Sequence, residues 1–110
     1  MLEEKREYRR IKDSIQIKYE IEHKKIPLTS YTKDISEGGF LFTTNKVIPI
    51  DSIISVKFFI THSDEFLCAE AKVIRVEEIV DNRIYEVGIQ FINISNDDIM
   101  KLSKYVTNKE

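Results

Sequence analysis

The sequence contains very few of the residues that build covalent or metal-bound sites. It has one cysteine, two histidines and no tryptophan among 110 residues. The single Cys68 cannot form an internal disulfide, and no zinc-ligand spacing is present. No apolar run approaches the roughly 18 residues that span a bilayer, and the N-terminus lacks the hydrophobic core of a signal peptide. The sequence therefore predicts a cytoplasmic protein with no metal site and no membrane association.

Proline, glycine and alanine are also scarce, with two, three and two copies, whereas β-branched residues are abundant. The chain holds 18 Ile, 7 Val and 6 Thr, whose stiff side chains favour pleated, half-buried surfaces. A length of 110 residues suits one domain that buries its core without metal or disulfide support. The composition predicts a single, mainly β domain.

Alternation of apolar and polar residues predicts six strands. They cover residues 14–21, 30–35, 40–42, 54–60, 66–78 and 85–91. The fifth is too long for one flat strand, so we expect a bulge near Ala71 to Val73. Cys68 falls within this strand and is predicted to be a small core residue. Short strands at even spacing predict a small sandwich or barrel, and a closed barrel would remove exposed sheet edges.

The last segment has the period of a helix. Ser95 is a suitable N-cap, and acidic residues follow it where the helix dipole favours negative charge. The apolar residues Ile99, Leu102 and Val106 then fall on one helical face. The pattern predicts a three-turn helix that lies across one opening of the barrel.

Two short motifs near the start of the chain carry the candidate site. Arg6 and Arg10 stand four residues apart in a polar segment, residues 1–12, whose five basic and three acidic side chains give a local charge of +2. After one strand and a turn, Asp34, Ser36 and Gly39 form the pattern D-x-S-x-x-G. Either motif alone has an ordinary explanation. The arginines suit a solvated face, and the second motif suits a turn in which Asp34 and Ser36 bond the local backbone.

Together, and ahead of a β-rich chain, the two motifs resemble those of the PilZ domain family, the bacterial receptors for the second messenger cyclic di-GMP. The family signature is RxxxR before the first strand and [D/N]xSxxG between the second and third strands, and every signature position matches. The stretch 87–91 and the segment opened by Ser95 are similar to the family's last strand and C-terminal helix. The resemblance implies a six-stranded antiparallel PilZ-type β-barrel with a short C-terminal α-helix over residues 13–110. A flexible N-terminal segment, residues 1–12, would carry the arginine motif.

The resemblance also implies that Arg6, Arg10, Asp34, Ser36 and Gly39 bind cyclic di-GMP, and their chemistry suits this ligand. A guanidinium can bind a phosphate bidentately, pair with a guanine edge or stack on the base. A carboxylate accepts from the N1–H and N2–H donors of guanine, a hydroxyl can donate to a phosphate, and a glycine permits positive φ or close approach. The residues that could add further contacts are Lys5, Arg9 and Gly38.

Catalysis has little support in the sequence. His23 and His62 lie in polar turns, and the run His62-Ser63-Asp64 is not a triad, because triad groups converge from separate elements. We therefore expect a non-enzymatic receptor with no cofactor beyond its ligand. Ligand binding would change the conformation of the N-terminal segment and signal to a protein partner, in motility, pilus, polysaccharide or transcription machinery.

Two other functions are compatible with the same pattern. One is a ligand-independent adaptor with the same fold, against which the complete signature counts. The other is a small barrel that binds single-stranded nucleic acid, against which the net charge of −2 and the mostly inward-alternating aromatic residues count. The number of bound cyclic di-GMP molecules, one or a stacked pair, stays open.

Overall fold

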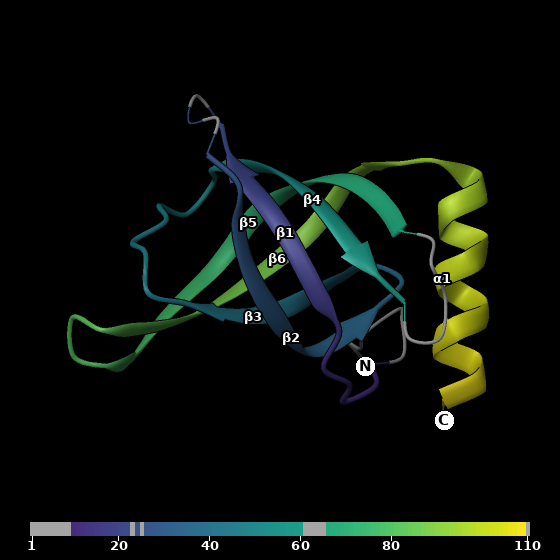
Figure 1. Ribbon diagram of the computed structural model, residues 1–110, viewed down its shortest axis with the longest axis horizontal. Helices are drawn as coiled ribbons and strands as arrows, with labels where there is room; N and C mark the ends of the chain where they lie inside the picture. Colours follow the sequence, from purple (N-terminus) through teal and green to yellow (C-terminus); the bar gives the residue numbers. More distant parts are fainter. Residues whose placement is uncertain (1–9, 23, 25, 61–65, 110) are drawn as a thin grey trace, which may run out of the picture.

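The computed structural model describes residues 10–22, 24, 26–60 and 66–109. These residues form six antiparallel strands that close into a barrel, followed by one helix (Figure 1). In chain order the elements are β1 (Gln16–Ile21), β2 (Leu28–Ser36), β3 (Gly39–Thr44), β4 (Ile53–Phe59), β5 (Phe66–Val80), β6 (Ile84–Ile94) and α1 (Asn96–Lys109). The predicted mainly β fold, a six-stranded antiparallel barrel with a C-terminal helix, is confirmed.

The strand order around the barrel is β1-β2-β3-β6-β5-β4, and the pairing of β1 with β4 closes the ring. β4 pairs with β5 only as far as Lys72, whereas β5 continues to Val80 beside β6. The hairpin of β5 and β6 therefore projects beyond the barrel at its tip (Figure 1).

Alternate residues of each strand point into the barrel, as the period-two pattern predicts. Phe40, Phe42 and Phe58 are the largest fully buried side chains. The ring of Phe40 lies 5.8 Å from those of Phe58 and Phe91, with the rings edge to face. The core is thus centred on aromatic residues that three strands, β3, β4 and β6, contribute.

Cys68 does not belong to this core. Its neighbours Leu67 and Ala69 point inward, so Cys68 points outward and is exposed. The prediction that Cys68 is a core residue is wrong, because apolar character alone did not fix which face of β5 it occupies.

The long strand β5 is irregular, as predicted. Its register against β6 shifts between Glu70 and Ala71 and again between Val73 and Arg75, on either side of the predicted position. A third shift occurs between Glu78 and Val80. Bulges bend and twist a strand, so they let β5 curve around the barrel and then leave it.

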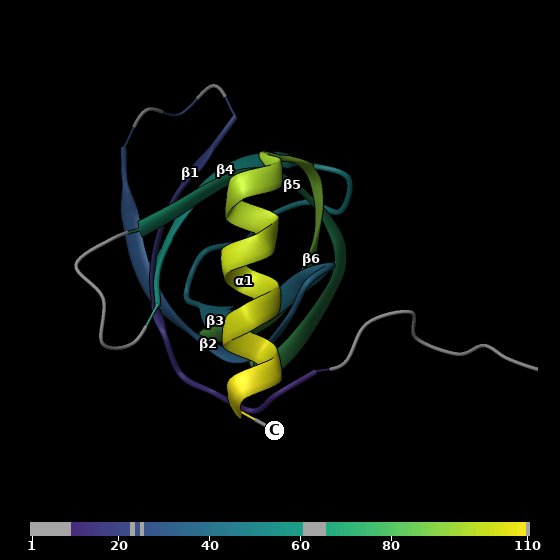
Figure 2. The ribbon, with the colours of Figure 1, turned by 90° about the vertical axis from the view of Figure 1, so that its right-hand side faces the viewer.

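The helix α1 begins at the predicted cap. The backbone N–H of Asp98 donates to Ser95 Oγ at 3.1 Å, and the helix runs for 14 residues, one turn longer than predicted. Leu102, Tyr105 and Val106 are buried, and Figure 2 shows α1 lying across one end of the barrel. No helix of the described residues is long and apolar enough to cross a membrane.

The contacts of the barrel begin before β1. Ile11 forms an isolated antiparallel bridge with Ile35 of β2, with N–H···O distances of 3.0 Å in both directions. Thr32 then ties the next residues down: its hydroxyl donates to the carbonyl of Asp13 at 2.6 Å and accepts from the N–H of Ile15 at 3.0 Å. The hydroxyl of Tyr105 in α1 donates to the carboxylate of Asp13. The chain between the arginine motif and β1 is therefore fixed to both β2 and α1.

Candidate functional site

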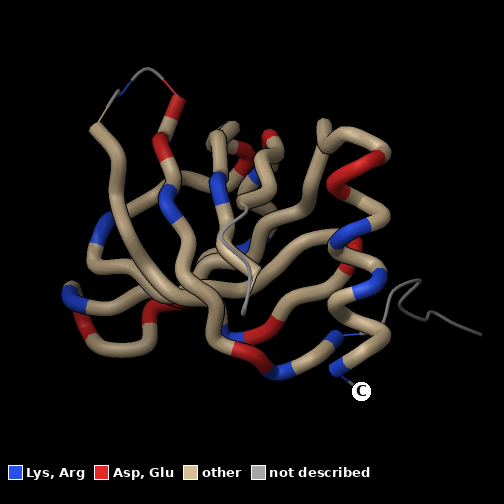
Figure 3. The backbone as a smooth tube through the Cα atoms, turned by 45° about the vertical axis from the view of Figure 1, so that its right-hand side comes forward, with Lys and Arg blue, Asp and Glu red and all other residues tan. Residues whose placement is uncertain are grey.

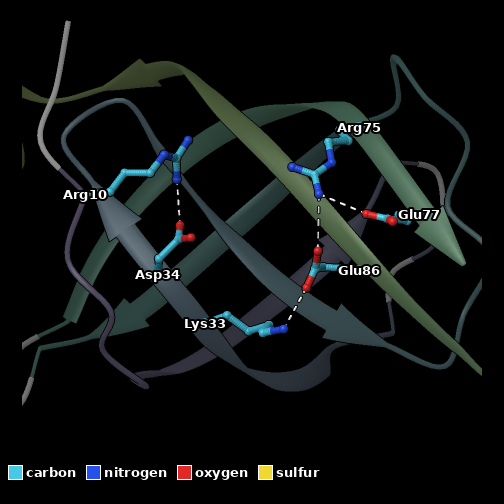
Figure 4. A network of polar contacts seen from close by, with 6 residues as sticks. All are labelled: Arg10, Lys33, Asp34, Arg75, Glu77 and Glu86. Atoms are coloured by element: carbon cyan, nitrogen blue, oxygen red, sulfur yellow. Dashed lines mark hydrogen bonds and ion pairs between the residues drawn. The ribbon is translucent and has the colours of Figure 1, made fainter. Parts of the chain in front are cut away.

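The bridge between Ile11 and Ile35 brings the two sequence motifs together. Both isoleucines are buried in the core, so the residues that precede them in each strand point to the outside. Those residues are Arg10 and Asp34. Nη1 of Arg10 lies 2.6 Å from Oδ1 of Asp34, across 24 residues of sequence (Figure 4). One arginine of the first motif thus contacts the acidic residue of the second.

The pair is partly exposed, with 32% of the Arg10 side chain and 21% of the Asp34 side chain accessible. Exposed ion pairs contribute only about 0–1 kcal/mol, so a ligand can rearrange this one at small cost. The guanidinium has five N–H donors, and the carboxylate can accept at both oxygens. Both groups therefore keep hydrogen-bonding capacity for a ligand beyond the contact that they make with each other.

Ser36 has a different role, because its side chain is buried with 3% of the residue exposed. Its hydroxyl accepts from the N–H of Gly38 at 3.1 Å and donates to the carbonyl of Gly39 at 3.3 Å. Ser36 therefore holds the turn between β2 and β3. Of the two residues that could bond the local backbone, Ser36 does so, while Asp34 bonds Arg10 instead.

Gly39 lies where β3 meets β6. A β-carbon on this residue would stand 2.0 Å from the carbonyl oxygen of Ile89 and 3.1 Å from Cα of Gln90, and φ of Gly39 is +158°. The main chain of β6 therefore occupies the space that any larger side chain would need. The carbonyl of Gly38 also accepts from the N–H of Phe91 at 2.9 Å. The two glycines fasten the turn directly against β6.

A second charged cluster lies beside the pair, and the sequence motifs did not indicate it. Lys33 Nζ lies 2.7 Å from Oε2 of Glu86, and Arg75 Nη2 lies 3.3 Å from the other oxygen of that carboxylate and 3.0 Å from Glu77 (Figure 4). The hydrogen bond and charge of Glu86 raise the pKa of Lys33, with a smaller contribution from the Asp34 carboxylate. Asp34 thus has cationic neighbours in both Arg10 and Lys33.

The sequence alone gave little indication of this cluster. Lys33 adjoins Asp34 in the chain, but Glu86 and Arg75 come from β6 and β5 and have no motif spacing. The strand order β2-β3-β6-β5 brings these residues to one side of the sheet.

Several predicted residues lie outside the described part of the chain. Among them are three basic residues of the N-terminal segment, Lys5, Arg6 and Arg9, and also the two histidines, His23 and His62. Within the described residues, no group of three or more His, Cys, Asp or Glu side chains is arranged to hold a metal ion.

A closed six-stranded barrel, with a helix across one opening and residues of two motifs in contact beside the first hairpin, defines a small β-barrel domain with a candidate surface site. Residues 4–108 match the PilZ domain family, and the chain belongs to it. The resemblance drawn from the two motifs is therefore confirmed. No curated protein sequence matches the chain.

Solved structures of low sequence identity share the fold. The PilZ domain of YcgR from Escherichia coli, solved with c-di-GMP, has a TM-score of 0.72 at 15% identity, covering 96% of this chain and 92% of that one. Bacillus subtilis inhibitor of motility (MotI/DgrA) has a TM-score of 0.82 at 15% identity, covering 96% and 51%. The MrkH–c-di-GMP complex of K. pneumonia has a TM-score of 0.79 at 16% identity, covering 97% and 53%. This chain therefore spans about half the length of the MotI and MrkH chains.

Proposed function

We propose that this protein is a cyclic di-GMP receptor that binds its ligand at the surface around Arg10 and Asp34. The observation that carries the proposal is the contact between these two side chains, because it joins the two halves of the PilZ signature at 2.6 Å. Membership of the PilZ family supports the proposal. Two proteins with the same fold, the YcgR PilZ domain and MrkH, have structures with c-di-GMP.

Among the described residues, some would contact the ligand and others would hold the backbone in place. Arg10 offers its guanidinium to a phosphate or to a guanine, and Asp34 accepts from the Watson–Crick edge of a guanine. Ser36, Gly38 and Gly39 shape the turn on which Asp34 is presented, and Gly38 and Gly39 anchor it to β6. Arg6 is proposed as a second guanidinium contact, with Lys5 and Arg9 as further basic contacts. Neither bond making nor bond breaking is needed, so the proposed role is non-enzymatic.

Isothermal titration with cyclic di-GMP, and with cyclic di-AMP as the specificity control, tests the proposal. Charge-assisted hydrogen bonds contribute roughly 1.5–3 kcal/mol each, so Arg10→Ala should weaken binding about 10- to 100-fold. Arg83→Ala is the matched control, because this exposed arginine lies at the tip of the β5–β6 hairpin. Absence of cyclic di-GMP binding by the parent protein would refute the function. Equal losses for both variants would refute the site.

We further propose that ligand binding changes the conformation of the N-terminal segment, which then signals to a partner. The hydrogen bonds between Ile11 and Ile35 fix the end of this segment to the barrel, so the change would concern the residues before Arg10. Trypsin cleavage after Arg6 and Arg9 should slow at saturating cyclic di-GMP. Cleavage after Arg10 should be slow with or without ligand, because the following N–H is already bonded. Cleavage after Arg6 and Arg9 at the same rate in both conditions would contradict the switch.

The partner of such a receptor would belong to motility, pilus, polysaccharide or transcription machinery, and the protein would act in the cytoplasm. MotI, one of the proteins with the same fold, is named as an inhibitor of motility, which supports the first of these processes.

A further inference from the structure

The outer face of β1, β4 and β5 sorts its charges into two rows of opposite sign. Lys18 stands directly opposite Lys57 in the pairing of β1 with β4. Two residues further along β1, Glu20 stands opposite Ser55, which in turn stands opposite Glu70 of β5. One row across the strands is therefore basic, and the adjacent row is acidic.

A third row on the same face is aromatic. Phe59 and Phe66 are paired across β4 and β5 with ring centroids 5.9 Å apart. In the same row, Gln16 of β1 pairs with Tyr31 of β2. Tyr31 and Phe66 are 55% and 46% exposed, and the ammonium of Lys57 lies 4.5 Å from the centre of the Phe66 ring. The aromatic row therefore adjoins the basic row on the side away from the acidic one.

The ammonium of Lys57 is stabilised by its contact with the Phe66 ring, but the pairing of like charges is not stabilised within the chain. Like charges directly opposite each other on a sheet are destabilising, and exchanging one lysine with one glutamate would remove the conflict. Among the described residues, no ion pair involves any of the four side chains Lys18, Lys57, Glu20 and Glu70. Figure 3 shows basic and acidic residues along most of the backbone, and in α1 the acidic residues of the first turn precede the basic residues.

The face is also hollowed. A groove of about 680 Å³ is lined by both charged rows, from Lys18 and Lys57 to Glu20 and Glu70. Exposed aromatic side chains are enriched at protein–protein interfaces, where they supply much of the binding energy.

We infer that this face docks an α-helix of a protein partner that lies along the strands. Its sequence pattern is an apolar residue, then an acidic residue four positions later, then a basic residue four positions after that. Rows two residues apart on a strand are about 6.6 Å apart, and residues four apart on a helix rise about 6 Å along one face. The apolar residue would meet Phe59 and Phe66, the acidic residue Lys18 and Lys57, and the basic residue Glu20 and Glu70.

The charges of the face favour this occupant over nucleic acid or an anionic membrane. Aromatic and basic rows alone would suit a single-stranded nucleic acid. The acidic row would repel phosphates about two residues further along the same strands, whereas a helix with charges of both signs satisfies every row. The inference does not depend on cyclic di-GMP, since none of these residues belongs to the proposed ligand site.

Binding of stapled synthetic helices to the isotope-labelled full chain, followed by NMR, tests the inference. The probe carries leucine, glutamate and lysine at successive positions four apart, and the control peptide has glutamate and lysine exchanged. We expect the probe to shift the amide resonances of Lys18, Lys57 and Phe66 and to bind at least about 10-fold more tightly than the control. Equal binding of both peptides, or no binding of either, would overturn the inference.

Variants of the protein locate the contact. Lys57→Glu should weaken binding of the probe, because the basic row would then carry charges of both signs, whereas Lys104→Glu on α1, with the same change of charge elsewhere, should leave probe binding unchanged. Circular dichroism of each variant checks that the fold is retained. Single-stranded RNA and phosphatidylglycerol vesicles are tested in parallel. If either binds the parent protein through Lys57 more tightly than the probe peptide does, the inference is wrong.

Discussion

Gly39 allows a sharp test of how the motif between β2 and β3 works. Its β-carbon position lies 2.0 Å from the carbonyl oxygen of Ile89, whereas ordinary contacts of this kind begin at 3.4 Å. Gly39→Ala would therefore force β6 and β3 apart by more than 1 Å, the difference between these two distances. Ile89 is itself paired with Phe40 of β3 and Val73 of β5, so the ladder holds it from both sides and resists this movement.

The expected cost follows from these contacts. Overpacking a tight site costs about 1–3 kcal/mol, and loss of the adjoining hydrogen bond from the N–H of Phe91 to the carbonyl of Gly38 costs about 1 kcal/mol more. Gly39→Ala should thus lower the free energy of unfolding by roughly 3 kcal/mol. A shift of 1 kcal/mol moves the melting temperature of a domain of this size by about 4–8 °C, so we expect a fall of more than 10 °C.

Gly88→Ala is the matched control. This glycine is also buried in the barrel wall, but a β-carbon there would lie 3.5 Å from Cβ of Arg75 and 3.6 Å from Cδ1 of Leu41, which are ordinary contacts. Its unfolding free energy should change by less than about 1 kcal/mol, with a stabilising contribution from reduced freedom of the unfolded chain. Urea unfolding followed by far-UV circular dichroism measures both variants, and cyclic di-GMP titration accompanies it.

Two results would refute the reasoning. If Gly39→Ala has the same urea midpoint as the parent protein but does not bind cyclic di-GMP, the glycine is needed for approach of the ligand and not for close packing of β3 against β6. If Gly88→Ala is destabilised as strongly as Gly39→Ala, the barrel wall tolerates no added methyl group and the specific clash with Ile89 is not the cause.

Three further predictions concern the core and its polar contacts. Burial raises the pKa of Tyr19 above its ordinary value of about 10, although its hydrogen bond with Thr44 opposes this. The unfolded chain therefore loses this proton first, so stability should fall as pH rises above about 10, and Tyr19→Phe should make the fall shallower in urea unfolding at pH 9 to 11. Thr32→Val should cost about 1–3 kcal/mol, because the buried N–H of Ile15 loses its partner; an unchanged urea midpoint would contradict this. Leu102→Ala should cost about 2–5 kcal/mol if α1 is part of the core, and a loss below 1 kcal/mol would show that the helix is only loosely attached.

The strand pattern was readable from the sequence because period-two alternation reflects burial on one side of each strand. Ile17, Val56 and Phe58 are buried where the alternation places them. Cys68 was misplaced because its apolar character was read as burial. It lies between the inward-pointing Leu67 and Ala69, before the first register shift of β5, so the alternation itself places it on the outer face.

The candidate site was only partly readable. The two motifs gave Asp34 and Arg10, which the fold brings into contact. The Lys33–Glu86–Arg75 cluster could not be predicted, because its members come from three strands that only the strand order β2-β3-β6-β5 brings near one another. The packing of Gly39 against β6 could not be predicted either, because the backbone that crowds this glycine, at Ile89, lies 50 residues later in the chain.

The contact between the motifs depends on a residue that belongs to neither. Ile11 is buried and bridged to Ile35, and this pairing sets the face on which the preceding residues emerge. A shift of one residue in the bridge would turn Arg10 toward the core and separate it from Asp34, although all signature residues would remain. The spacing of Arg10 from the first buried isoleucine is thus as necessary as the arginine itself. A chain with both motifs but with a polar residue at position 11 would carry the signature without the means to assemble it.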